Sequence, residues 1–385
     1  MPPSITFGCG ALASLPALLA DIGSVRPLLV TDACVMAHRH PAKLHDSMMT
    51  AGYALDIWDG VESDPAEDHV QACRARLIEG DYDAVIAMGG GSVIDVAKVA
   101  SVMARHNLDF CDIYGFDRIQ GVGIPVIAVP TNAGGGAEIS CHAAIYAPTV
   151  GKKEVVAGTY CLARAAVIDP DLSLTLSAEN LLSSSLDGLI HAMESSLARR
   201  ANTITNLFAG TAIPLLIKNI PAAMNNPQCR EVRRDLSLGC LYSAIAMANA
   251  NVGAIHAVGY PISAGYGVPH GLANSAMAAV TLAAIWPGRV KRCSTLARML
   301  DRRLLGVDDE TAAASLSKTV HAFMAKLGVV QNIGELGVAP DDLDRLASQA
   351  IQFVPILKNT PVELSERDLK QLYRQALNCQ PAGTC

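Results

Sequence analysis

The sequence predicts an α/β domain with a mostly parallel sheet over residues 1–175, followed by an all-helical domain over residues 176–385. In the first half, short and continuously apolar β-rich runs alternate with helical patterns, which is typical of a parallel sheet covered on both faces. After Asp169-Pro170-Asp171, long Ala-, Leu- and Met-rich stretches replace the strand-like runs. A chain of 385 residues is also long enough for two hydrophobic cores.

Five strands are expected in the first domain, each a short apolar run that ends at a turn or a polar residue. They are RPLLVTD (26–32), ALDIWDG (54–60), YDAVIAMGGG (82–91), IPVIAVPT (124–131) and AAVIDPD (165–171). Between them, CRARLIEG (73–80) and SVIDVAKVASVMAR (92–105) carry apolar residues at helical spacing. The helical segments of the second domain include LLSSSLDGLIHAMESSLARR (181–200), RRDLSLGCLYSAIAMANANVGAIHAV (233–258) and ANSAMAAVTLAAIW (273–286).

Composition excludes several classes of protein. Hydrophobic residues make up 51% of the chain and charged residues 17%, so a large buried core is expected rather than disorder. The net charge of −6 argues against nucleic acid as a partner. Neither a signal peptide nor a membrane span is expected from the apolar runs. The 11 cysteines, from Cys9 to Cys385, include no CxxC pair, which favours reduced thiols in a cytoplasmic protein.

Two glycine-rich loops follow predicted strands. Gly89-Gly90-Gly91-Ser92 leads into a helix, and PTNAGGGAEIS (130–140) follows the next apolar strand. Glycines allow a phosphate to approach the backbone, and a helix N-terminus offers N–H groups and a positive dipole. Loops at the ends of neighbouring parallel strands would border one ligand-binding crevice. A tight turn without a ligand, with Ser92 as a helix cap, is the alternative, since the chain lacks the GxGxxG fingerprint.

Asp32 ends the predicted strand LLVTD. A carboxylate at this position can accept hydrogen bonds from ribose hydroxyls and would repel a 2′-phosphate, which favours NAD over NADP. The alternative role for Asp32 is the N-cap of a following helix.

Four residues of the second domain form a candidate site for one divalent metal ion: Asp187, His191, His256 and His270. Asp187 and His191 are one helical turn apart and therefore project from the same helix face. The two other histidines border the segment HAVGYPISAGYGVPH. Three imidazoles and one carboxylate suit Fe(II), with Zn(II) as an alternative, and leave room for a substrate oxygen. His321, the other histidine of this half, lies in an ordinary amphipathic pattern.

These motifs, taken in order, resemble the iron-containing (group III) alcohol dehydrogenases over nearly the whole chain. The matching segments are FGCGALASL, LLVTD, GGGSVIDVAK, PTNAGGGAE, DGLIHAMES, HAVGYPISAGYGVPHGLANSAM and NTPVELSERDLKQLYRQAL. The resemblance implies a dehydroquinate synthase-like fold, in which an N-terminal dinucleotide-binding domain precedes a helical metal-binding domain, with the active site in the cleft between them. It also implies a small-molecule alcohol or aldehyde as substrate, and a homodimer or larger homo-oligomer.

The resemblance assigns roles to individual residues. Asp187, His191, His256 and His270 correspond to the metal ligands of the family. The pyrophosphate loop of the family's cofactor site corresponds to Gly89, Gly90, Gly91, Ser92 and Asp95. The contacts to pyrophosphate and nicotinamide correspond to Thr131 and Asn132, and the position that selects NAD corresponds to Asp32.

Three departures from the family pattern stand out. The usual PTTxGTGSE is PTNAGGGAE, so that Asn132, Gly135 and Ala137 replace two threonines and a serine. Tyr260 replaces a histidine that many members have four residues after the third ligand. Asn359-Thr360-Pro361 stands where many members have a Pro-Arg pair, which leaves the substrate end of the cleft undefined.

The expected reaction is hydride transfer between the carbinol carbon and a nicotinamide, with the metal lowering the pKa of the alcohol oxygen. Tyr260 is the candidate proton relay, or alternatively an aromatic wall of the pocket, because an unperturbed tyrosine with a pKa of about 10 is a poor base near neutrality. The alternative functions are those of a glycerol dehydrogenase or dehydroquinate synthase, or of a non-catalytic metal- or nucleotide-binding relative. The four retained ligands argue against a metal-independent maleylacetate reductase.

Overall fold

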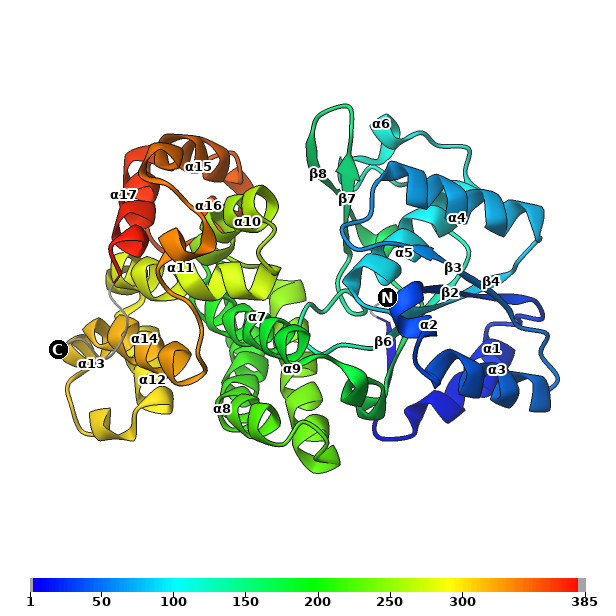
Figure 1. The fold of residues 1–385 in the computed structure, drawn as a ribbon, viewed down its shortest axis with the longest axis horizontal. Helices are drawn as coiled ribbons and strands as arrows, with labels where there is room; N and C mark the ends of the chain where they lie inside the picture. Colours follow the sequence, from blue (N-terminus) through cyan, green and yellow to red (C-terminus); the bar gives the residue numbers. More distant parts are fainter. Residues whose placement is uncertain (1–2, 380–385) are drawn as a thin grey trace. The chain divides into compact units, whose positions relative to one another are not determined.

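In a computed structural model that describes residues 3–379, the chain divides into two compact units. The first extends to Leu176 and the second begins at Ser177 (Figure 1). Cys385 lies outside the described residues, and the ten described cysteines are thiols rather than disulfides.

The first unit is built on a six-stranded parallel sheet, as the sequence predicted. Its strands, in spatial order, are β1 (Ser4–Phe7), β9 (Ala165–Ile168), β6 (Val126–Pro130), β4 (Ala84–Gly89), β2 (Pro27–Asp32) and β3 (Asp56–Val61). The edge strand β1 was not expected from the sequence. It is only four residues long and partly exposed, so it lacks the continuous apolar run that marks the central strands.

Helices cover both faces of this sheet because alternate residues of a strand point to opposite sides. Val85 and Ala87 of β4 pack with α4 (Glu67–Glu79) and α5 (Gly91–Arg105). Ile86 and Met88 pack on the other face with α1 (Leu15–Asp21) and α3 (His40–Thr50). The short helices α2 (Ala33–Met36) and α6 (Phe110–Ile113) complete the unit.

A second, three-stranded sheet in the first unit was missed at the sequence level. It consists of β5 (Gly115–Phe116), β8 (Lys152–Ala157) and β7 (His142–Ala147), with β7 and β8 antiparallel. The first residues of β8, Lys152 and Lys153, are charged and exposed, so this hairpin lacks the continuous apolar run used to identify the other strands.

The second unit is helical, and no strand occurs among its residues from 177 to 379. Its α-helices are α7 (Ala178–Leu197), α8 (Thr203–Asn225), α9 (Arg230–Ala250), α10 (Ala254–Tyr266), α11 (His270–Ile285), α12 (Val290–Leu300), α13 (Asp309–Ala314), α14 (Leu316–Lys326), α15 (Leu343–Ala350), α16 (Val354–Asn359) and α17 (Glu366–Leu377). By length and composition α8 could cross a membrane. Part of its surface packs on α7 and α9 (Figure 1), and the core helices of soluble proteins pass the same test.

The predicted helical stretch 233–258 is broken into two helices, α9 and α10, which meet at an angle of 107°. Asn251, at the break, has a φ of 63° and a ψ of 177°, a strained conformation outside the left-handed helical region that is otherwise nearly confined to glycine. The bend matters because it directs the first turn of α10, which contains His256, against α7.

Close packing of α11 on α7 depends on Gly271. A Cβ atom at this position would lie 1.9 Å from the backbone oxygen of Ser183 in α7. Gly259 of α10 has a similar role, since a Cβ there would lie 2.0 Å from Oδ1 of Asn274 in α11. The two glycines therefore set how closely the three helices approach one another.

We expect Gly271→Ala to lower the free energy of unfolding by about 1–3 kcal/mol, the usual cost of overpacking a well-packed core. Gly210→Ala in α8 is the matched control, because a Cβ there meets nothing within 4 Å. The control should be stabilising by about 0.4–1 kcal/mol through the unfolded state. Denaturant unfolding of the metal-free proteins measures both changes, and equal effects at the two positions would contradict this packing.

Candidate functional site

The two glycine-rich loops lie side by side at the carboxyl ends of β4 and β6, as the sequence predicted. Gly89 is in register with Pro130, and the Thr131 N–H donates to the Gly89 oxygen at 3.0 Å. A Cβ on Gly90 would lie 3.6 Å from Nδ2 of Asn132. Gly90 is the N-cap of α5, so the first N–H groups of this helix, which have no partner within the helix, lie at the glycine-rich loops. Because Gly90 is the N-cap, Ser92 lies inside the helix.

Asp95 does not point toward these loops. Its side chain is buried between α5 and β7, where Oδ2 accepts a hydrogen bond of 3.0 Å from the Ala144 N–H. Burial raises the pKa of Asp95 to about 6. The buried Lys98, one turn further along α5, donates to the backbone oxygens of Ala137, Ser140 and His142. Lys98 thus fixes the end of the second glycine-rich loop, a role that the sequence analysis missed.

Asp32 is the N-cap of α2, the alternative considered from the sequence. Its Oδ1 accepts a hydrogen bond of 2.8 Å from the Val35 N–H. This bond uses one carboxylate oxygen, and the preference for NAD stays a prediction.

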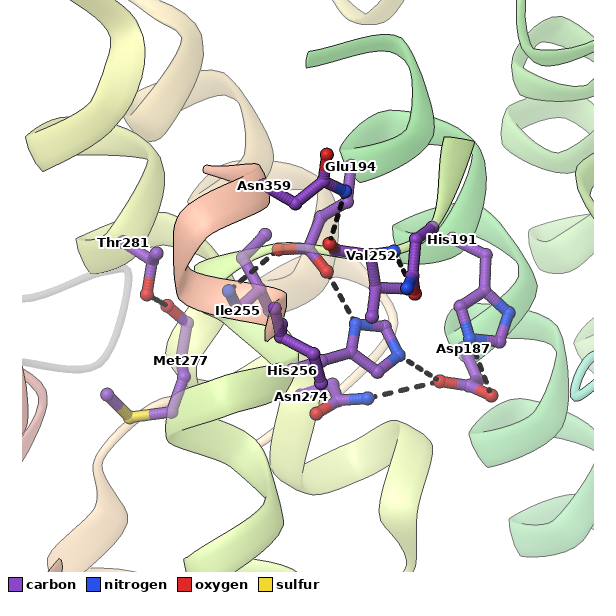
Figure 2. Close-up of polar contacts among 12 residues, drawn as sticks. Asp187, His191, Glu194, Val252, Ile255, His256, Asn274, Met277, Thr281 and Asn359 are labelled. Atoms are coloured by element: carbon purple, nitrogen blue, oxygen red, sulfur yellow. Dashed lines mark hydrogen bonds and ion pairs between the residues drawn. The ribbon is translucent and has the colours of Figure 1, made fainter. Parts of the chain in front are cut away.

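The four candidate metal ligands converge in the second unit, from α7, α10 and the first residue of α11. Figure 2 shows Asp187, His191 and His256 among them. Oδ2 of Asp187 lies 3.6 Å from Nε2 of His191, one turn further along the same helix. Oδ1 of Asp187 lies 3.4 Å from Nε2 of His256 and 3.6 Å from Nε2 of His270. The ring of His191 is stacked on that of His256 at a centroid distance of 4.7 Å. One carboxylate therefore contacts three imidazoles.

The cluster is buried except at His270. Asp187, His191 and His256 are each at most 6% exposed, whereas the side chain of His270 is 36% exposed. Burial alone would raise the pKa of Asp187, but the neighbouring imidazoles hold it well below its usual range. Burial lowers the pKa of His256, and the carboxylates of Glu194 and Asp187 outweigh this effect and raise it to about 9.

This arrangement fits a divalent metal ion. Ligand atoms of Asp187, His256 and His270 all lie within 4.8 Å of one another. Nε2 of His256 is buried, lies 3.4 Å from Oδ1 of Asp187 and makes no standard hydrogen bond among residues 3–379, so a bound metal ion would satisfy an otherwise poorly paired nitrogen. Three imidazole nitrogens and a carboxylate oxygen are donors that Fe(II) and Zn(II) accept.

Two further residues of the site were missed at the sequence level, Glu194 and Asn274. Glu194 contacts Nδ1 of His256 through Oε2 at 2.5 Å. The Asn274 amide donates to Oδ1 of Asp187 at 3.1 Å and lies 3.0 Å from Nε2 of His270. Their spacing was a usable signal. Glu194 is seven residues after Asp187 and Asn274 is four after His270, so each shares a helix face with a candidate ligand.

Tyr260 lies beside the cluster as a packed aromatic ring. It stacks on His270 at a centroid distance of 5.1 Å and contacts Phe353 at 4.9 Å. Burial, together with the carboxylates of Asp187 and Glu194, raises the pKa of the Tyr260 phenol above its ordinary value.

The Asn359-Thr360-Pro361 segment supports the break between α9 and α10. Nδ2 of Asn359 donates to the backbone oxygens of Ala250 and Val252, both at 2.8 Å (Figure 2 shows the bond to Val252). These two carbonyls flank Asn251, the residue with positive φ. The departure from the family pattern at this segment thus has a structural consequence, since Asn359 holds the turn that precedes His256.

Comparison with known proteins identifies close matches over the whole length. The family models "Iron-containing alcohol dehydrogenase" and "Fe-containing alcohol dehydrogenase family, C-terminal" match residues 2–170 and 181–377. The 4-hydroxybutyrate dehydrogenase of Cupriavidus necator is 29% identical over 378 residues, 96% of this chain and 96% of that protein. The long-chain-alcohol dehydrogenase 1 of Geobacillus thermodenitrificans is 26% identical over 386 residues, 100% of this chain and 96% of that protein.

A solved structure of a 1,3-propanediol oxidoreductase matches the fold with a TM-score of 0.94 at 25% identity, and the match covers 97% of this chain and 98% of that one. The family expected from the motifs is therefore confirmed, and the chain belongs to the iron-containing alcohol dehydrogenases.

Proposed function

We propose that this chain is a metal-dependent, NAD-linked oxidoreductase that interconverts a small alcohol or hydroxy acid with its aldehyde or ketone. Oxidoreduction of alcohol and carbonyl pairs is the chemistry of the family to which the chain belongs. The observation that carries the proposal is the convergence of Asp187, His256 and His270, with His191 3.6 Å from the same carboxylate.

We propose Asp187, His191, His256 and His270 as the ligands of one Fe(II) ion, with Zn(II) as the alternative. When bound, such an ion would act as a Lewis acid toward the alcohol or carbonyl oxygen. Glu194 holds His256 through Nδ1, and the Asn274 amide holds Asp187 through Oδ1. The exposure of His270 leaves one side of the cluster accessible to a small substrate.

The glycine-rich loops are the proposed site for the pyrophosphate of the cofactor. The N-terminus of α5 and the loop backbone offer N–H groups to a phosphate, and Thr131 and Asn132 border the same place. NAD held by these residues would supply the hydride acceptor for the substrate carbon. Asp32 would select NAD over NADP by repelling the 2′-phosphate. Asp95 would act indirectly, since its buried side chain ties α5 to β7.

We further propose a cytoplasmic homo-oligomer, a dimer or larger. The large number of thiols favours a reducing compartment.

The relatives include a lactaldehyde reductase of Escherichia coli and an NAD-dependent methanol dehydrogenase of Bacillus methanolicus, so both short alcohols and hydroxyaldehydes belong in the substrate panel.

The function is tested with protein loaded anaerobically with Fe(II) or Zn(II) and assayed for NADH formation and consumption across alcohols, hydroxy acids and aldehydes. We expect turnover with at least one metal and a higher kcat/KM with NAD than with NADP. His256→Ala should abolish metal retention and turnover, whereas the control His321→Ala, on α14, should change neither. If the wild type shows no turnover with any metal or cofactor tested, the proposal is contradicted. Normal turnover by His256→Ala would contradict the ligand set.

Tyr260 is proposed either as a proton relay or as a wall of the substrate pocket. Its stacking between His270 and Phe353 supports the wall, and we therefore expect Tyr260→Phe to lower kcat by less than about tenfold, since general acid–base catalysis usually contributes about 10²–10⁴-fold. Steady-state kinetics of the metal-loaded variant measure the change. A loss in the larger range would instead establish the hydroxyl as the relay.

A further inference from the structure

The carboxylate of Glu194 makes two hydrogen bonds to the same turn of α10 (Figure 2). Oε2 lies 2.5 Å from Nδ1 of His256, and Oε1 accepts a bond of 2.7 Å from the backbone N–H of Ile255. Glu194 is 3% exposed and His256 is 1% exposed. Both oxygens of a buried carboxylate are therefore committed to one imidazole and to the backbone beside it.

These bonds determine which nitrogen of His256 faces the metal centre. A carboxylate accepts but does not donate, so the partner nitrogen Nδ1 carries a proton. The lone pair of the neutral ring is then on Nε2, the atom directed at Asp187 from 3.4 Å. A hydrogen bond at one ring nitrogen commonly fixes both the tautomer and the orientation of a metal-binding histidine.

The backbone around Glu194 is built to keep this contact. Gly253, at the N-cap of α10, allows close approach, because a Cβ there would lie 3.2 Å from Oε1 of Glu194. Asn359 holds the carbonyls of Ala250 and Val252, which precede this N-cap. The start of α10 is thus fixed by Asn359, and Glu194 joins that fixed turn to α7.

We propose that Glu194 is a positioning residue that presents Nε2 of His256 to the metal ion. It acts through His256 rather than by touching the substrate. This inference rests on the proposed metal centre and deepens it, since it assigns part of the metal affinity to a residue that is not itself a ligand.

Glu194→Gln separates positioning from packing because it preserves the shape of the side chain. The Ile255 N–H still needs an acceptor, so the amide oxygen takes that position and the amide NH₂ faces Nδ1. Nδ1 must then accept, which places the proton on Nε2 and blocks it as a ligand. Glu194→Ala removes the constraint altogether and leaves the ring able to use either tautomer.

The experiment is a titration of metal-free protein with Co(II), followed by its visible d–d absorption, with thermal unfolding of each metal-free variant measured in parallel. Outer contacts to metal-binding histidines are commonly worth about 10–100-fold in affinity. We therefore expect Glu194→Gln to weaken Co(II) binding by that factor and to alter the spectrum, with a smaller loss of unfolding midpoint in the metal-free protein than Glu194→Ala causes. Glu194→Ala should weaken binding no more than Glu194→Gln does.

Ser195→Ala is the matched control. Ser195 is the next residue of α7, is fully buried, and its hydroxyl has no hydrogen-bond partner among residues 3–379. This variant should bind Co(II) as the wild type does.

Wild-type affinity and spectrum in Glu194→Gln would overturn the inference while leaving the metal centre intact. If the variants lose Co(II) affinity only in proportion to their loss of stability, and Glu194→Ala loses far more than Glu194→Gln, then Glu194 has a packing role. That result would also overturn the inference. Absence of Co(II) uptake by the wild type would instead overturn the proposed function, and this inference with it.

Discussion

A buried carboxylate with three imidazoles around it is the interaction on which the second unit depends. Moving an ionised carboxylate out of water is strongly unfavourable unless other groups compensate for the lost hydration. At Asp187 the compensation comes from His191, His256 and His270 together with the Asn274 amide. Since these groups belong to three helices, the charge of Asp187 is satisfied only when α7, α10 and α11 are in place.

The packing around Asp187 is arranged so that these helices approach closely and in one register. A side chain at position 271 would collide with α7, and one at position 259 would collide with Asn274, so glycine at both positions allows the close approach. The bend before α10, held by Asn359, directs His256 toward Asp187 rather than along the axis of α9. Glu194 then joins the two helices on the far side of the same ring. The ligands and their supports form one continuous polar network.

Much of this could be predicted from the sequence because the signals are local. The apolar runs that became β2, β4, β6 and β9 and the one-turn spacing of Asp187 and His191 needed only short segments of chain. The break at Asn251 was not predicted, because an apolar helical pattern runs through it, and Asn359, which hydrogen-bonds this turn, lies more than 100 residues away. Asp95 and Lys98 lie in a helix whose start was identified, yet their burial depends on β7, in a sheet without an apolar run. The features that the sequence did not predict depend on contacts between residues that are far apart in the chain.

The most direct test of the metal centre is X-ray absorption spectroscopy of the Zn(II)-loaded protein at one metal ion per chain. The proposed ligand set should give a shell of four light atoms at about 2.0–2.2 Å, with the outer scattering of three imidazoles and one carboxylate oxygen among the nearest neighbours. Sulfur scattering at about 2.3 Å, or a shell without imidazole scattering, would place the metal elsewhere and contradict it.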